Sequence, residues 1–65
     1  MRTAADQENS GSHFILGVMY DHGYGVPEND TEAVKWFRKA AVQGNAKAQT
    51  NLGIMYVLGI GVPED

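Results

Sequence analysis

The sequence predicts an all-α fold, an α/α superhelix (solenoid) of antiparallel helical hairpins that contains just under two repeats. A unit of 36 residues recurs, since residues 1–29 and 37–65 are identical at 14 of 29 positions. Apolar residues between 30 and 43 are spaced three and four apart, as on one face of a helix. Glycines also follow each copy of the next apolar segment, where helices are expected to end.

A fixed period of this length is typical of a solenoid, because one helical hairpin cannot bury its apolar face alone. We expect one segment, 1–65, in which 1–9 are the tail of a preceding helix, 10–45 a complete repeat and 46–65 a partial repeat. The chain has 65 residues and no cysteine, so its core is small and no disulfide supports it.

The first helix is expected over about 10–22, with a loop over 23–27. The next is expected over 30–43, because Asn29 and Glu32 have the spacing of a capping box. Gly44 is expected to adopt the left-handed conformation that ends such a helix. The last helix is expected over 46–58, with Gly59 at its end and a loop over 59–63.

Each predicted helix has an apolar stripe that should face the core. The residues expected to point inward are Leu16, Tyr20, Ala33, Trp36, Phe37, Ala40, Ala41, Ala48, Leu52, Met55 and Tyr56. Gly17 and Gly53 lie inside predicted helices, where a glycine costs roughly 1 kcal/mol relative to alanine. Since the cost recurs at the same place in both copies, we expect a neighbouring helix to approach closely at each.

These motifs resemble the Sel1-like repeat, which is related to the tetratricopeptide repeat superfamily. The matching residues are Leu16-Gly17, Tyr20, Gly23, Gly25-Val26, Trp36, Lys39-Ala40-Ala41, Gln43-Gly44, Ala46 and Ala48-Gln49, and the pattern restarts at Leu52-Gly53, Tyr56, Gly59 and Gly61. The resemblance implies a non-catalytic module that scaffolds protein complexes, here as a fragment of a longer array. Some cysteine-rich members of the family resemble β-lactam hydrolases, an alternative that the absence of cysteine disfavours.

No catalytic, cofactor or metal site is expected. The segment 23–28 lacks the third glycine and the Lys-Ser/Thr pair of a phosphate loop. His13 and His22 are nine residues apart, so on one helix they point to opposite faces and cannot share a metal ion. Ser10, Ser12, His13 and Asp21 are the residue types of a hydrolytic triad, but no pattern brings them together. Glu32, Lys35, Arg38 and Lys39 are expected to form a solvated helix face with local ion pairs.

Charge and hydropathy restrict the partners further. The formal net charge is −3 and the sequence pI is about 5.1, which disfavours nucleic acid, because phosphate binding needs a clustered basic face. Neither a signal peptide nor an apolar run of the roughly 20 residues that span a membrane is visible. The sequence therefore favours a soluble protein. Its compartment stays unknown, and the cytoplasm is the favoured one.

The expected partner is a protein or peptide of unknown identity. It would bind the concave face that the first helices of successive repeats line. The residues predicted for this face are Phe14, Val18, Asp21, Thr50, Ile54 and Val57. Two alternatives remain open at this point: these residues pack on neighbouring repeats, or the chain associates with itself through its uncapped ends.

Overall fold

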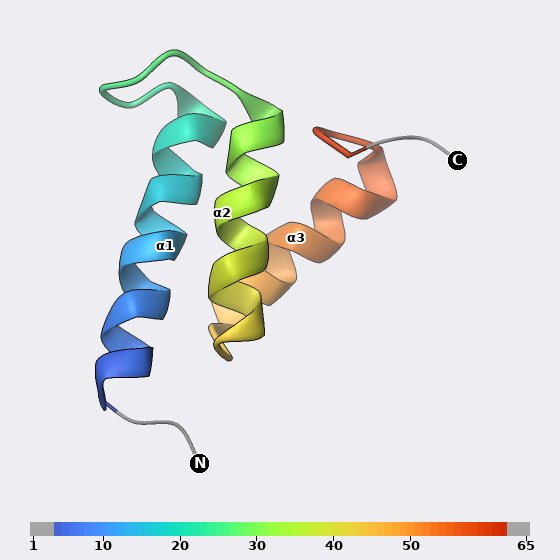
Figure 1. Cartoon of the computed structure of the whole chain (residues 1–65). Helices are drawn as coiled ribbons and strands as arrows, with labels where there is room; N and C mark the ends of the chain where they lie inside the picture. Colours follow the sequence, from blue (N-terminus) through green and yellow to red (C-terminus); the bar gives the residue numbers. More distant parts are fainter. Residues whose placement is uncertain (1–3, 63–65) are drawn as a thin grey trace.

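The computed structural model describes the backbone of residues 4–62 and the side chains of residues 9–62. Within these residues the chain is all-α, with three helices and no strand: α1 (Ala4–His22), α2 (Asp30–Val42) and α3 (Ala46–Leu58). α2 packs against both α1 and α3 (Figure 1). None of the described helices is long and apolar enough to cross a membrane.

α1 is longer than predicted, because the expected break near residue 9 does not occur. The equivalent break between α2 and α3 depends on Gly44, which has a φ of +93°. The first copy has Glu8 at this position, and residues with a Cβ avoid positive φ. Residues 4–9 therefore continue into α1 and do not form the tail of a separate helix; residues 1–3 lie outside the described part.

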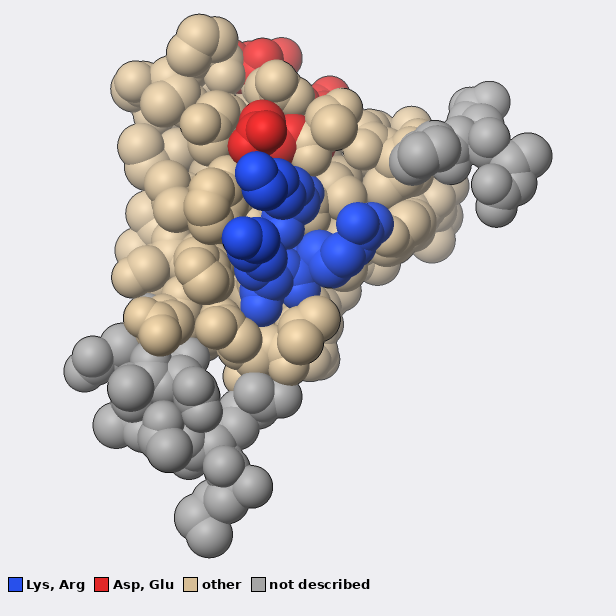
Figure 2. Space-filling view, viewed as in Figure 1, with Lys and Arg blue, Asp and Glu red and all other residues tan. Residues whose placement is uncertain are grey.

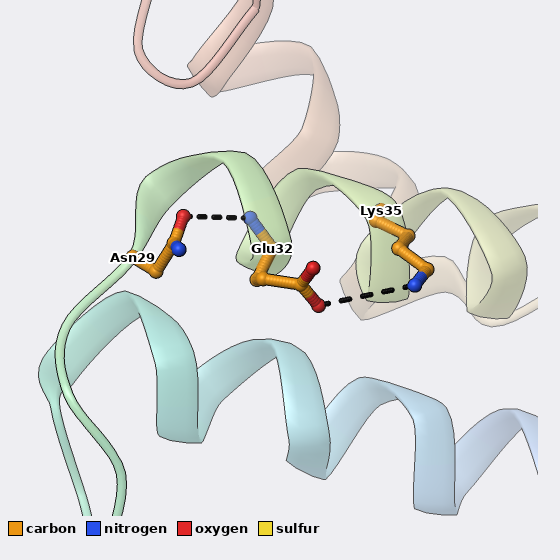
Figure 3. A network of polar contacts seen from close by, with 3 residues as sticks. All are labelled: Asn29, Glu32 and Lys35. Carbon is orange, nitrogen blue, oxygen red and sulfur yellow. Dashed lines mark hydrogen bonds and ion pairs between the residues drawn. The ribbon is translucent and has the colours of Figure 1, made fainter.

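α2 begins as predicted. Asn29 is extended, and its side-chain Oδ1 accepts a hydrogen bond from the backbone N–H of Glu32 at 3.0 Å (Figure 3). The Glu32 side chain points along the helix and lies 4.0 Å from Lys35 Nζ, so it pairs with a cation one turn later. A capping box has two hydrogen bonds, and the structure shows the one that the Asn29 side chain accepts.

Replacing this cap is expected to weaken α2. The variant Asn29→Ala removes the acceptor for the Glu32 N–H and should lower the free energy of unfolding by about 1 kcal/mol. Asn29→Asp keeps an acceptor and adds a charge favoured at a helix N-terminus, so it should be nearly neutral. Urea denaturation of both variants measures this, and equal losses would argue against the cap.

α3 has the predicted bounds and the same kind of cap. Asn45 Oδ1 accepts from the Ala48 N–H at 2.9 Å, and Gly59 ends the helix with a φ of +68°. The loop after Gly59 returns to the start of α2, where a Cβ on Gly61 would overlap the backbone carbonyl of Asp30. The part of the predicted loop at residue 63 lies outside the described residues.

The core lies where α2 faces the other two helices. Its buried apolar residues are Ala33, Val34, Phe37, Ala40, Ala48 and Met55. Leu52, Tyr20 and Ala41 pack against it while partly exposed. Val34 is missing from the predicted apolar stripe, which runs through Ala33 and Trp36 on the other side of the helix.

Two aromatic residues predicted to point inward are not in this core. Trp36 is half-buried, and its Nε1 has no hydrogen-bond partner among the described residues. Tyr56 is 47% exposed; its ring and hydroxyl contact the Arg38 guanidinium, which donates to the hydroxyl. The counterpart of Tyr56 one repeat earlier, Tyr20, packs against the core, and its backbone carbonyl accepts a hydrogen bond from the Asn29 N–H at the start of α2.

Candidate functional site

The interface between α1 and α2 is built around a glycine. A Cβ added at Gly17 would lie 2.6 Å from two ring carbons of Phe37, which is closer than side-chain atoms approach. The Phe37 ring is 1% exposed and its centroid is 5.7 Å from that of Phe14. The close approach predicted at Gly17 is therefore confirmed, and α1 has a face that receives an aromatic ring.

The same prediction is wrong for Gly53, the counterpart of Gly17 in the second copy. A Cβ built at Gly53 meets nothing within 4 Å, and the residue is exposed. Gly17 has its neighbour because α2 follows α1. None of the described residues places a ring on Gly53 in this way.

Gly53 lies in an open hollow of about 440 Å³ on α3. We call its lining residues the α3 face: Gln49, Thr50, Gly53, Ile54, Val57 and Leu58. None of them is charged, and the apolar ones are well exposed, with Val57 at 85% and Leu58 at 64%. Exposed apolar residues that adjoin one another in this way are typical of a binding surface.

The residues predicted for a concave binding face divide between three places. Phe14 and Val18 pack against the core in the α1–α2 interface while partly exposed, so a role for them in partner binding stays a prediction. Their apolar character serves the contact with α2, which the sequence reasoning did not assign to this side of the helix. Asp21 lines a separate hollow of about 240 Å³, and Ile54 is one of the other residues that line it.

Thr50, Ile54 and Val57 lie together on the α3 face. Gln49, Gly53 and Leu58 belong to the same surface, and the sequence reasoning missed them as site residues. The repeat contained a signal for Gly53, because this residue lies 36 positions after Gly17, where α2 packs against α1.

A second hollow, of about 460 Å³, lies along the last turns of α2. We call it the cationic hollow; its lining residues are His13, Lys35, Arg38, Lys39, Val42 and Gln43. Figure 2 shows Lys and Arg side chains gathered over α2 on the face seen in Figure 1, with acidic side chains at the upper margin. The sequence prediction of a face of local ion pairs holds for Lys35 with Glu32, whereas Arg38 and Lys39 contact aromatic rings.

The indole of Trp36 lies beside this hollow. Lys35 Nζ and Lys39 Nζ are 5.4 and 5.0 Å from the indole centroid, within the range of cation–π attraction. The His13 ring is 5.4 Å from the same indole, and its Nδ1–H donates to Gln43 Oε1 at 3.0 Å. α1 and α2 thus hold the aromatic and cationic groups together.

The residues of a hydrolytic triad are engaged in other contacts. His13 bonds to Gln43, while Asp21 Oδ2 lies 3.6 Å from His22 Nε2. The His22 ring stacks on Tyr24 with centroids 5.0 Å apart. In the part of the chain that the structure describes, no group of three or more His, Cys, Asp or Glu side chains could hold a metal ion.

Comparison with known proteins agrees with this architecture. The family model described as Sel1 repeat matches residues 10–45 and 46–65. A crystal structure of a Sel1 repeat protein from Oxalobacter formigenes is similar, with a TM-score of 0.84 and 45% sequence identity over 95% of this chain. The chain spans 26% of the length of that protein. No curated protein matches the chain. With both family matches in place, the chain belongs to the Sel1 repeat family.

Proposed function

We propose that this chain is a non-catalytic protein-binding module and that the α3 face receives an amphipathic helix of its partner. Sel1 repeats typically mediate protein–protein interactions. The observation that carries the proposal is the pair of equivalent glycines. Gly17 is filled by an aromatic ring, and Gly53 has the same place in its helix with open space above it.

The α1–α2 interface serves as a template for this contact. Gly53 and Ile54 are the counterparts of Gly17 and Val18, 36 residues earlier. The α3 face therefore corresponds to the face of α1 that packs against Phe37. Around Phe37, α2 presents the small buried residues Ala33 and Ala40, which let two helices approach closely. A partner helix should therefore present one aromatic ring over Gly53, with small residues one turn before and after it.

The lining of the α3 face also fits a helix better than an extended strand or a charged ligand. Its six residues recur at three- and four-residue spacing along α3, which is the ridge that a second helix packs against. No charge on this surface needs to be desolvated or paired when a helix covers it. Burial of Ile54, Val57 and Leu58 would supply the driving force.

A peptide with the sequence of residues 29–43, including its own cap and Phe37, tests the proposal as a model partner. The labelled peptide should bind the chain, as measured by fluorescence anisotropy, and its Phe37→Ala form should bind more than about tenfold more weakly. The chain variant Gly53→Leu fills the space meant for the ring and should cause a similar loss. Gly11→Leu is the matched control, because Gly11 is a helix glycine with open space away from this face.

Several outcomes would contradict the proposal. Peptide binding that is insensitive to Gly53→Leu would place the contact elsewhere. A loss caused by Gly17→Leu alone would mean that the peptide replaces α2 on α1. A concentration-dependent dimer that the peptide fails to dissociate would show that a second copy occupies the α3 face.

A further inference from the structure

We propose that the cationic hollow is a second binding site, which takes a short acidic peptide segment. It shares no lining residue with the α3 face. Its lining residues come from α1, from α2 and from Gln43 at the end of α2, and Tyr56 of α3 contacts Arg38 beside it.

The cations are concentrated although the chain as a whole is acidic. The chain has eight Asp and Glu residues against five Lys and Arg residues. Three of those five, Lys35, Arg38 and Lys39, line one hollow, and no acidic residue lines it. Local positive potential on an acidic protein favours a ligand with a few negative charges that contacts this region alone.

Aromatic contacts hold two of the cationic heads in position before a ligand arrives. Lys39 Nζ lies over the Trp36 indole, and the Arg38 guanidinium donates to the Tyr56 hydroxyl. A side chain that is already positioned loses less conformational freedom when it binds a carboxylate. Lys35 is shared with Glu32 at 4.0 Å, a pair weak enough for a ligand carboxylate to compete with it.

Apolar surface lies between these charges. Val42 lines the hollow and is 73% exposed, and the aliphatic stems of the lysines and the arginine add to it. Gln43, which is fixed by His13, offers its amide N–H groups at the same wall. The ligand should therefore alternate carboxylates with an apolar side chain, as a peptide can.

A nucleic acid fits this hollow less well. Specific and non-specific DNA binding relies on many phosphate contacts, typically about 6–10, while the hollow offers three cations. The net charge of −3 also repels an extended polyanion as it approaches. A short acidic segment avoids most of this repulsion, because it carries less charge and contacts only the hollow.

Trp36 provides the measurement, since it is the only tryptophan in the chain and borders the hollow. The probe is the acetylated and amidated hexapeptide Glu-Glu-Leu-Glu-Glu-Leu, titrated into the full chain at about 0.15 M ionic strength, where charges are screened beyond about 8 Å. We expect a saturable change in Trp36 emission. The same peptide with Gln in place of Glu should leave the emission unchanged.

Two charge-reversed variants separate the site from general electrostatics. Lys39→Glu should weaken binding of the acidic hexapeptide more than about fivefold. Lys47→Glu changes the net charge by the same amount outside the lining, and it should change the affinity less than about twofold. Circular dichroism confirms that both variants remain helical.

Three results would overturn the proposal. Trp36 emission could remain constant up to millimolar hexapeptide, or the two lysine variants could weaken binding equally. Alternatively, a 20-nucleotide oligothymidylate or vesicles of anionic phospholipid could bind more tightly than the hexapeptide and displace it. That last result would assign the surface to a polyanion.

Discussion

Replacing Phe37 with alanine is expected to lower the free energy of unfolding by about 3–5 kcal/mol, the largest effect of any single substitution considered for this chain. Phe37 is the largest fully buried side chain, and it contacts both Gly17 and the ring of Phe14. Its loss leaves a cavity that α1 cannot close, because Gly17 has no side chain to move into the space.

A loss of this size approaches the whole stability expected for a 65-residue chain, about 3–10 kcal/mol. The variant Phe37→Leu keeps most of the volume and should cost less than about 1.5 kcal/mol, so it remains measurable if Phe37→Ala unfolds. Urea denaturation, followed by helical circular dichroism, gives both values. Val57→Ala is the control, because Val57 is 85% exposed and its truncation should be nearly neutral. A loss below 1 kcal/mol for Phe37→Ala would contradict the placement of this ring in the core.

The second large effect is that the same substitution, glycine to alanine, should lower the stability at Gly17 and raise it at Gly53. Gly17→Ala puts a methyl group 2.6 Å from the Phe37 ring, and the resulting overpacking should cost about 1–3 kcal/mol. Gly53→Ala places the same methyl group in open space. There the better helix propensity of alanine should raise the stability by about 0.5–1 kcal/mol.

Thermal unfolding of the two variants side by side measures this difference. The comparison is well controlled, because the substitution, the helix type and the position within the repeat are the same. If both variants shifted the melting temperature in the same direction, either the ring would not sit on Gly17 or something would already cover Gly53. A destabilised Gly53→Ala would point to the latter.

Much of the fold could be predicted because the repeat shows the residues of most turns twice in the sequence. Asn29 and Gly59 cap the helices as predicted, and the bounds of α3 match the prediction. The start of α1 could not be placed in the same way. The repeat predicts a turn at Glu8, because Glu8 is the counterpart of Gly44. The turn at Gly44 needs a positive φ, which glutamate rarely adopts.

The environment of the second copy was harder to predict than its backbone. Identical residues suggest identical contacts, but Tyr56 and Gly53 are exposed where Tyr20 and Gly17 are covered. Within the described residues, α2 packs on Gly17 and no element packs on Gly53, although the repeat motif is the same in both copies.

The cationic hollow could not be predicted from the sequence of α2 alone. Spacing along one helix suggested that Glu32, Lys35, Arg38 and Lys39 would form a solvated face with local ion pairs. The observed geometry needs side chains from other helices, since His13 comes from α1 and Tyr56 from α3. Contacts between residues 18 and 30 positions apart carry no local pattern that identifies them.

The central claim is that the α3 face receives a helix in the way that α1 receives α2. Nuclear magnetic resonance of the ¹⁵N-labelled chain with the unlabelled 29–43 peptide tests it most directly. We expect amide shift changes concentrated on residues 49–58, and contacts between the aromatic ring of the peptide and the α-protons of Gly53. Shift changes confined to α1, or saturation of the peptide without any effect at Gly53, would contradict it.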